Sequence, residues 1–223
     1  MKRVTEFLNA LDMNNNKPWF DEHRQEYLET KAYFEDFVVR LIERIEHFDD
    51  TIYGLKASDC TYRIYRDIRF SKDKTPYKTH MGAYICPKGK KSGFGGYYFH
   101  VKGSRREGLS SHFLATGAVC MPNNVIRSIR EDVYSLCEEF EACVDRAEGF
   151  TLDTANKMKT TPRDFPKESK ANEYLKLRDF ILLKPVEESY VLSTDLLDRL
   201  EEDFSRTKTF NDFINRAIAA ERE

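Results

Sequence analysis

A seven-residue repeat of large apolar side chains near the N-terminus constrains the fold of this sequence most strongly. The repeat begins behind Asn16-Lys17-Pro18, where the asparagine or the lysine suits a helix cap and the proline suits the first turn. The side chains that recur on one side of the predicted helix are Phe20, Tyr27, Phe34, Leu41 and Phe48. This pattern predicts one helix of roughly 30 residues, about 45 Å long.

The middle of the chain contains a series of short extended segments. Residues 81–86, 97–101 and 109–118 are rich in apolar and aromatic side chains, and short loops separate them, which favours antiparallel pairing. Residues 180–183 predict a buried strand of the same sheet. Helical patterns fill most of the remainder, including one that starts at Pro122 and breaks near Leu136. We therefore expect an α+β fold with a central antiparallel sheet, a long N-terminal helix and a helical C-terminal part.

Length and composition set further limits. The chain has 223 residues and no segment with the composition of a linker, so we expect a single domain over residues 1–223. Its five cysteines are odd in number and form no Cys-x-x-Cys pair, which favours a reducing compartment, the cytoplasm. Since no apolar stretch approaches ~18 residues, no membrane contact is expected. The sequence predicts no cofactor and leaves the oligomeric state open.

Positive charge is concentrated in residues 62–80, which hold six basic residues and two acids. Alternation of apolar and polar side chains predicts a strand over 62–70, with Ile64, Ile68 and Phe70 on one side, followed by a turn. Two arginines about 7 Å apart on such a strand repel by about 2 kcal/mol. Either carboxylates such as Asp67 neutralise them in a structural ladder, or an anion binds there. The candidate anion-binding residues are Arg63, Arg66, Arg69, Lys72, Lys74 and Lys78.

The wider region 61–106 has 12 basic residues and 2 acids, so the acidic remainder of the chain offsets a basic centre. Nine aromatic side chains are interspersed among these cations, the combination with which proteins hold single-stranded nucleic acid. Aromatic residues at every second position of a sheet also build cores. We expect most of the nine to be buried, with Tyr65, Tyr77 and one of Tyr97 and Tyr98 exposed.

Two motifs resemble a known family. The segment RIYRDIRFSKDKTPYKTH, residues 63–80, looks like the signature of domain of unknown function 2461, and NNNKPWF, residues 14–20, followed by His23, Arg24 and Tyr27, resembles its opening motif. The resemblance implies a single α+β domain and no particular activity. Residues 112–121 lack a glycine-rich run expected in the family, and residues 161–165 lack a glycine after the proline.

Three kinds of function are compatible with these features. The first is a binding module for a phosphate-bearing partner, nucleic acid or a nucleotide, through residues 62–80. The second is an enzyme for a small phosphorylated or carboxylated substrate in a pocket over the sheet, with Arg66 holding the anion and Asp67 or His80 moving protons. The third is a scaffold that docks an acidic protein. No metal site is expected, because the spacing of His80, His100 and His112 does not require one.

Overall fold

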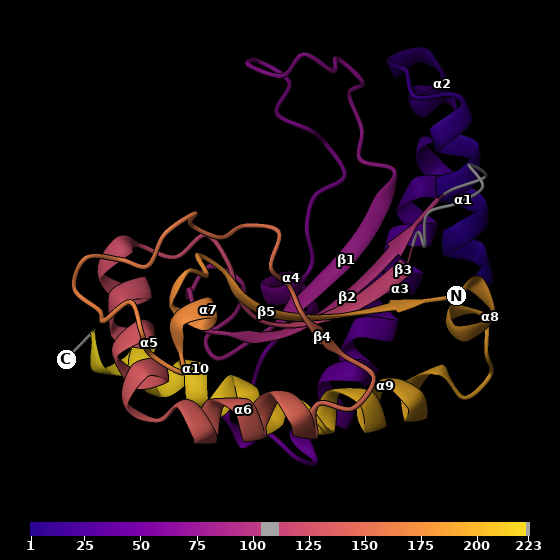
Figure 1. Ribbon diagram of the computed structural model, residues 1–223. Coiled ribbons are helices and arrows are strands. Elements are labelled where there is room, and N and C mark those ends of the chain that lie inside the picture. The colour runs from indigo at the N-terminus through magenta and orange to yellow at the C-terminus, as the bar shows by residue number, and fades with distance from the viewer. Residues whose placement is uncertain (104–111, 222–223) are drawn as a thin grey trace.

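A five-stranded antiparallel sheet forms the centre of the computed structural model, which describes residues 1–103 and 112–221 (Figure 1). The strands lie in the order β1-β2-β3-β5-β4. The pairing of three successive strands and the addition of a strand from residues 180–183 confirm the predicted sheet, although residues 109–111 of the predicted third strand lie outside the described residues. The bounds are β1 His80–Ile85, β2 Gly96–Lys102, β3 His112–Ala118, β4 Thr151–Leu152 and β5 Phe180–Val186.

Helices precede the strands, follow them and, as α5 to α7, lie between β3 and β5 in the chain, which together with the antiparallel sheet gives an α+β fold (Figure 1). Of these, α1, α3, α9 and α10 pack against one face of the sheet or against each other there. In the described part of the chain, no helix is both long enough and apolar enough to cross a membrane. The bounds are α1 Lys2–Met13, α2 Lys17–Glu22, α3 Arg24–Glu46, η1 Asp50–Ile52, α4 Ala57–Cys60, α5 Asn123–Ser135, α6 Cys137–Arg146, α7 Asn172–Leu175, α8 Glu188–Val191, α9 Leu196–Ser205 and α10 Lys208–Ala220.

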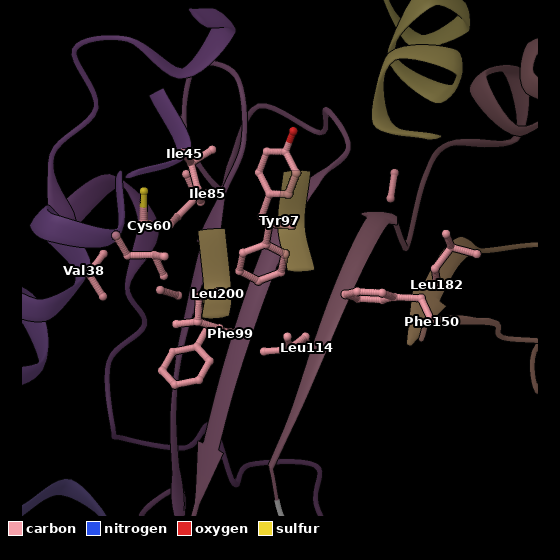
Figure 2. Packing of buried hydrophobic residues seen from close by; sticks show 14 of the residues in the cluster. Val38, Ile45, Cys60, Ile85, Tyr97, Phe99, Leu114, Phe150, Leu182 and Leu200 are labelled. Carbon is pink, nitrogen blue, oxygen red and sulfur yellow. The ribbon is translucent and has the colours of Figure 1, made fainter. Parts of the chain in front are cut away.

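The core lies between the sheet and these helices (Figure 2). Alternate residues of β2, among them Tyr97 and Phe99, point into it and are at most 1% exposed. The ring of Phe99 lies 5.6 Å from that of Phe37 on α3, and the ring of Tyr97 lies 5.4 Å from that of Phe204 on α9. Burial of each such side chain contributes about 1.5–3 kcal/mol, so β2 joins both helical segments to the sheet.

The predicted long N-terminal helix is divided in two at His23. Asn16 caps the first part, α2, by accepting the Trp19 backbone N–H at 3.1 Å, as expected for the residue before Lys17-Pro18. His23 then leaves the helical conformation with φ −98° and ψ 18°, its ring stacked on Trp19 and its Nδ1 2.8 Å from the Trp19 carbonyl oxygen. The helix restarts as α3 because Tyr27 donates its backbone N–H to the His23 carbonyl. The second predicted break, at Leu136 between α5 and α6, is confirmed.

The predicted strand over 62–70 is wrong. Residues 61–79 form a loop with only two isolated bridges, Thr61–Ala83 and Tyr65–Tyr77. Pro76 has no N–H for a ladder, and the Asp73 side chain accepts the Thr75 N–H at 2.9 Å, so local bonds replace pairing along a strand.

Burial in this loop also departs from the prediction. Phe70 is 97% exposed rather than inward-facing. Tyr77, expected to be exposed, is 4% exposed because it stacks on Phe20 with ring centroids 3.9 Å apart. The prediction holds for Tyr65, which is 48% exposed, and Tyr98 is less buried than Tyr97.

Candidate functional site

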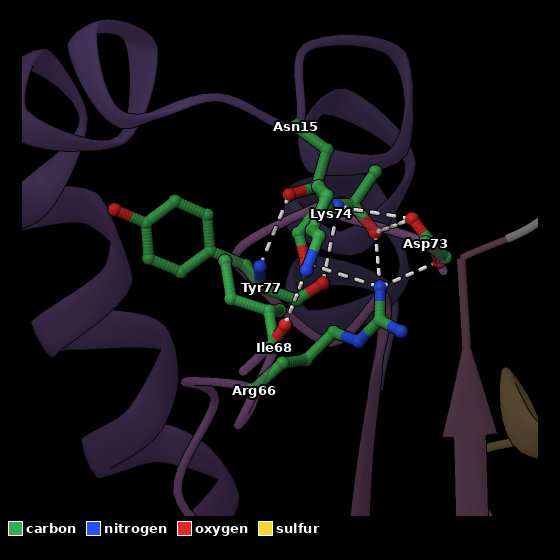
Figure 3. Close-up of polar contacts among 7 residues, drawn as sticks. Asn15, Arg66, Ile68, Asp73, Lys74 and Tyr77 are labelled. Carbon is green, nitrogen blue, oxygen red and sulfur yellow. Dashed lines mark hydrogen bonds and ion pairs between the residues drawn. The ribbon is translucent and has the colours of Figure 1, made fainter. Parts of the chain in front are cut away.

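The loop formed by residues 61–79 projects beyond the end of β1 and is held in shape by its own side chains (Figure 1). Arg66 Nη1 donates to Asp73 Oδ2 at 2.6 Å and to the Thr75 carbonyl oxygen at 3.0 Å (Figure 3). Lys74 Nζ donates to the Ile68 carbonyl oxygen at 3.0 Å. Two of the six candidate cations, Arg66 and Lys74, therefore stabilise the loop itself.

A third cation of the loop is paired with Asp67. Arg69 Nε and Nη2 donate to the two carboxylate oxygens of Asp67 at 2.9 Å and 2.6 Å. These bonds, together with the Arg69 backbone N–H, hold the pKa of Asp67 below its ordinary value. The carboxylate that was considered as a proton acceptor thus lies on the exposed loop in an ion pair.

The other three candidate cations are Arg63, Lys72 and Lys78, and none of them has a carboxylate partner among the described residues. Lys78 lies at the base of the loop with its ammonium group 5.5 Å from the centre of the Tyr62 ring. Burial and the charge of Arg63 lower its pKa. The structure therefore divides the predicted basic row into three residues bonded within the loop and three without a carboxylate partner among the described residues.

Asn15 ties the base of this loop to the N-terminal helices. Its side-chain amide donates to the Tyr77 carbonyl oxygen at 2.9 Å and its side-chain oxygen accepts the Tyr77 N–H at 3.1 Å (Figure 3). The two segments that carry the family resemblance, residues 14–20 and 63–80, are therefore in direct contact. Both contribute to placing the loop at the edge of the sheet.

A stack of rings runs across the sheet face opposite the helices. His80 of β1, His100 of β2 and Phe113 of β3 lie side by side, with successive ring centroids 4.6 Å and 4.3 Å apart. The Tyr98 hydroxyl is hydrogen-bonded to His100 Nδ1 at 2.9 Å.

Both stacked histidines are neutral at neutral pH. Burial, followed by the charges of Lys78, Lys102 and Arg66, lowers the pKa of His80 to about 4. Burial is also the main cause that lowers the pKa of His100 to about 3. His80 is therefore unsuited to donate a proton near pH 7. Its lone pair stays available as an acceptor.

The three histidines considered together for metal binding do not converge. His100 pairs across the sheet with Phe113, so His112, one residue earlier on β3, projects from the opposite face. Within residues 1–103 and 112–221, no group of three His, Cys, Asp or Glu side chains is arranged to hold a metal ion.

A pocket of about 580 Å³ lies on the same open face, beside the ring stack. Its floor is formed where small residues of β3, Ala115 and Gly117, lie between larger side chains of β2 and β5. The walls are almost entirely apolar or aromatic, a composition typical of sites for small organic ligands. The main wall residues are Tyr62, Tyr84, Phe94, Tyr98, Phe113, Ile181 and Leu183.

Three lysine side chains lie over aromatic rings of the pocket wall, and one of them, Lys90, lines the pocket itself. Lys90 lines it, donates to the Ser58 carbonyl oxygen at 2.5 Å and places its ammonium group 5.9 Å from the centre of the Tyr62 ring. Lys88 lies 5.8 Å from the centre of the Phe94 ring. Because Lys78 also lies over Tyr62, the pocket and the base of the loop share one cationic rim, which we define as Lys78, Lys88 and Lys90.

Reasoning from the sequence placed a possible pocket over the sheet but did not identify its residues. The available signal was the pair of small residues at positions 115 and 117, two apart on one face of a predicted strand and next to an aromatic strand. Their meaning depends on the pairing of Tyr98 with Ala115 and of Gly96 with Gly117, which only the structure supplies.

These features define an α+β protein whose antiparallel sheet is covered by helices on one face and carries a cation-rimmed apolar pocket on the other. The chain belongs to the family described as conserved hypothetical protein (DUF2461), whose family model matches residues 3–213. Neither a curated protein nor a solved structure matches the chain.

Proposed function

We propose that the protein binds a small ligand with a flat apolar body and one anionic group, a nucleotide or an aromatic carboxylate, in the pocket on the open sheet face. The observation that carries this proposal is the combination of an apolar pocket of about 580 Å³ with lysines over two of its wall rings, Tyr62 and Phe94. The proposal retains the phosphate-bearing partner expected from the sequence. It moves the binding site from the 62–80 segment itself to the pocket at its base.

The walls of the pocket favour a flat body. Tyr98 and Phe113 lie with ring centroids 5.7 Å apart along one wall, and Ile181 and Leu183 of β5 form the other. Most hydrogen-bonding groups of the walls are already engaged: the Tyr84 hydroxyl is 2.8 Å from the Phe94 carbonyl oxygen and 2.7 Å from that of Gly117. Binding of an apolar ring here is favoured by removal of its surface from water, about 25 cal/mol per Å².

The rim favours an anionic group at the Tyr62 end of the ligand. Three ammonium groups lie near the two aromatic rings there, and none of them forms an ion pair with a carboxylate of the described residues. A phosphate or carboxylate placed there would interact with these lysines through charge-assisted hydrogen bonds.

The test is a calorimetric titration with adenosine monophosphate and with adenosine, together with fluorescence titration of anilinonaphthalene sulfonate. We expect Leu183→Asp, which places a carboxylate in the apolar wall, to weaken binding of both anions by more than about tenfold. We expect Lys90→Gln to weaken adenosine monophosphate binding but to leave adenosine unchanged, because adenosine lacks the phosphate.

Leu192→Asp is the matched control, since Leu192 is 40% exposed and does not line the pocket. The three variants should have melting temperatures close to one another. Equal affinities of Leu183→Asp and Leu192→Asp for both anions would show that this pocket is not the binding site.

A specific observation also favours a second candidate, binding of single-stranded nucleic acid by the loop of residues 61–79. Phe70 is 97% exposed on this loop, and the internal bonds of Arg66 and Lys74 fix the backbone on either side of it. Base stacking on an aromatic ring contributes ~1–3 kcal/mol per base, and Arg63 and Lys72 are available for phosphates.

An oligonucleotide titration at two salt concentrations tests this second candidate. We expect binding of oligothymidine to weaken steeply with salt, and Phe70→Ala to weaken it about tenfold or more at either salt concentration. Because Phe70 is exposed, the variant should unfold at the same temperature as the wild type. Equal affinity of wild type and Phe70→Ala, or affinity independent of salt, would contradict this role of the loop.

A further inference from the structure

A second cavity, of about 590 Å³, lies away from the ring stack, between α5 and the segment of residues 153–170. Three arginines line it: Arg127 and Arg130 from α5, and Arg178 from the residues that precede β5. The cavity adjoins the pocket on the open face, because Cys120 lines both. None of its arginines belongs to the basic segment of residues 62–80.

Arg130 is a buried cation without a counter-ion. It is 9% exposed, and its Nη2 donates to the Leu177 carbonyl oxygen at 2.6 Å and contacts Met158 Sδ at 3.4 Å. Its Nε–H, also buried, has no acceptor. Burial of an uncompensated charge is strongly unfavourable, and burial together with the charge of Arg178 lowers the pKa of Arg130.

Arg178 adds a second unpaired cation. It is exposed at the edge of the cavity, and neither it nor Arg130 has a carboxylate oxygen of the described residues within 4.0 Å. Arg127 differs from these two, since its Nε donates to Glu131 at 3.0 Å. The two arginines without counter-ions therefore line one cavity of about 590 Å³ and repel each other.

The acids that line the cavity are held apart from the arginines. Asp179 accepts the Cys120 backbone N–H at 2.9 Å and the Asn156 side-chain amide at 2.6 Å. Asp164 is exposed on the far segment and forms no ion pair with a cation of the described residues. Asp164 and Asp179 therefore do not neutralise the charges of Arg130 and Arg178. Their carboxylate oxygens can accept hydrogen bonds from hydroxyl or amino groups of a ligand.

We propose that this cavity binds the phosphate or carboxylate group of a small hydroxylated or amino-bearing molecule, with Arg130 and Arg178 as its anion receptors. Planar guanidinium groups match both oxyanions with paired hydrogen bonds, and the buried position of Arg130 makes each bond stronger than it is at a surface. The site is separate from the pocket of the proposed function and does not depend on it.

The test uses inorganic phosphate and citrate at low ionic strength, with calorimetry for affinity and the arginine Nε–H region of NMR spectra for location. We expect both anions to bind the wild type and to shift the Nε–H resonance of Arg130. Arg178→Gln should weaken binding by about tenfold, the factor expected for one charge-assisted hydrogen bond. Arg178 is exposed, so this variant should fold even if Arg130→Met does not.

Arg163→Gln is the matched control, because it removes the same charge from the neighbouring segment without lining the cavity. It should bind phosphate and citrate like the wild type. If Arg163→Gln and Arg178→Gln weakened the affinity for phosphate and citrate equally, the effect would come from the net charge of the protein and not from this cavity. That result would overturn the proposal. So would an Arg130 resonance that both anions leave unshifted.

Discussion

Replacing Gly117 with alanine should destabilise the protein by about 2–6 kcal/mol, a large part of the 5–15 kcal/mol typical of a folded domain. Gly117 has φ +106°, where residues with a side chain are strained, and it lies between β2 and β5 in the sheet. A Cβ at this position would lie 2.0 Å from the Phe180 carbonyl oxygen and 2.9 Å from the Phe210 ring. The Phe180 carbonyl belongs to a paired strand, so it cannot move away without breaking the β3–β5 ladder.

Urea unfolding followed by circular dichroism measures this loss, with Gly54→Ala as the matched control. Gly54 has φ +80°, and a Cβ there would meet no atom within 4 Å, so only the conformational strain of about 1 kcal/mol remains. Similar losses in the two variants would show that contact with Phe180 is not the reason for glycine at position 117. The Gly117 variant should also lose ligand binding, because this residue lines the pocket and its carbonyl accepts from Tyr84.

The sheet and most helices could be predicted because their signals are local. The run of residues 97–101 is apolar at every second position and aromatic throughout its first part, and Pro122 followed by a regular apolar spacing gave the start of α5 correctly. In each case packing against the core reinforced a preference already present in the segment. Such agreement between local preference and tertiary contact is what makes an element predictable.

The alternation in residues 62–70 predicted a strand, but backbone pairing there stops at the single bridge between Tyr65 and Tyr77. Beyond it, Asp67, Asp73 and Thr75 form side-chain bonds within the loop, and Arg66 bonds to two of those residues, so the bridge does not extend into a ladder. The alternation placed Phe70 and Ile64 on the same apolar side, yet of these two side chains only Ile64 is buried in the core. A period-two pattern does not reveal which neighbours will compete for the backbone.

The candidate sites depended on contacts between distant parts of the chain. Tyr62 meets Lys90 at the pocket because residues 58–62 lie beside the loop between β1 and β2, and Arg130 meets the Leu177 carbonyl 47 positions away in the sequence. The charge and aromatic content of residues 61–106 predict an anionic partner. The location of the pocket and of the two unpaired arginines required the register of the sheet and the packing of α5.

Acidification should destabilise the wild type more than a variant without His100. Burial lowers the pKa of this imidazole to about 3, whereas in the unfolded chain it is about 6.5. Between these two values the unfolded state binds more protons than the folded state, so stability falls as the pH falls below about 6.5. At pH 4.5, two pH units below the unfolded value, His100 accounts for a loss of about 2–3 kcal/mol. His80, which is less buried and has a pKa of about 4, adds a smaller loss over the same range.

Urea unfolding at pH 7.5 and pH 4.5 tests this, with wild type, His100→Gln and, as a surface control, Tyr53→Gln, whose side chain is 84% exposed. The loss on acidification should be about 2–3 kcal/mol smaller in His100→Gln than in the wild type, and unchanged in Tyr53→Gln. Equal losses in all three proteins would contradict the assignment of this pH dependence to the ring stack.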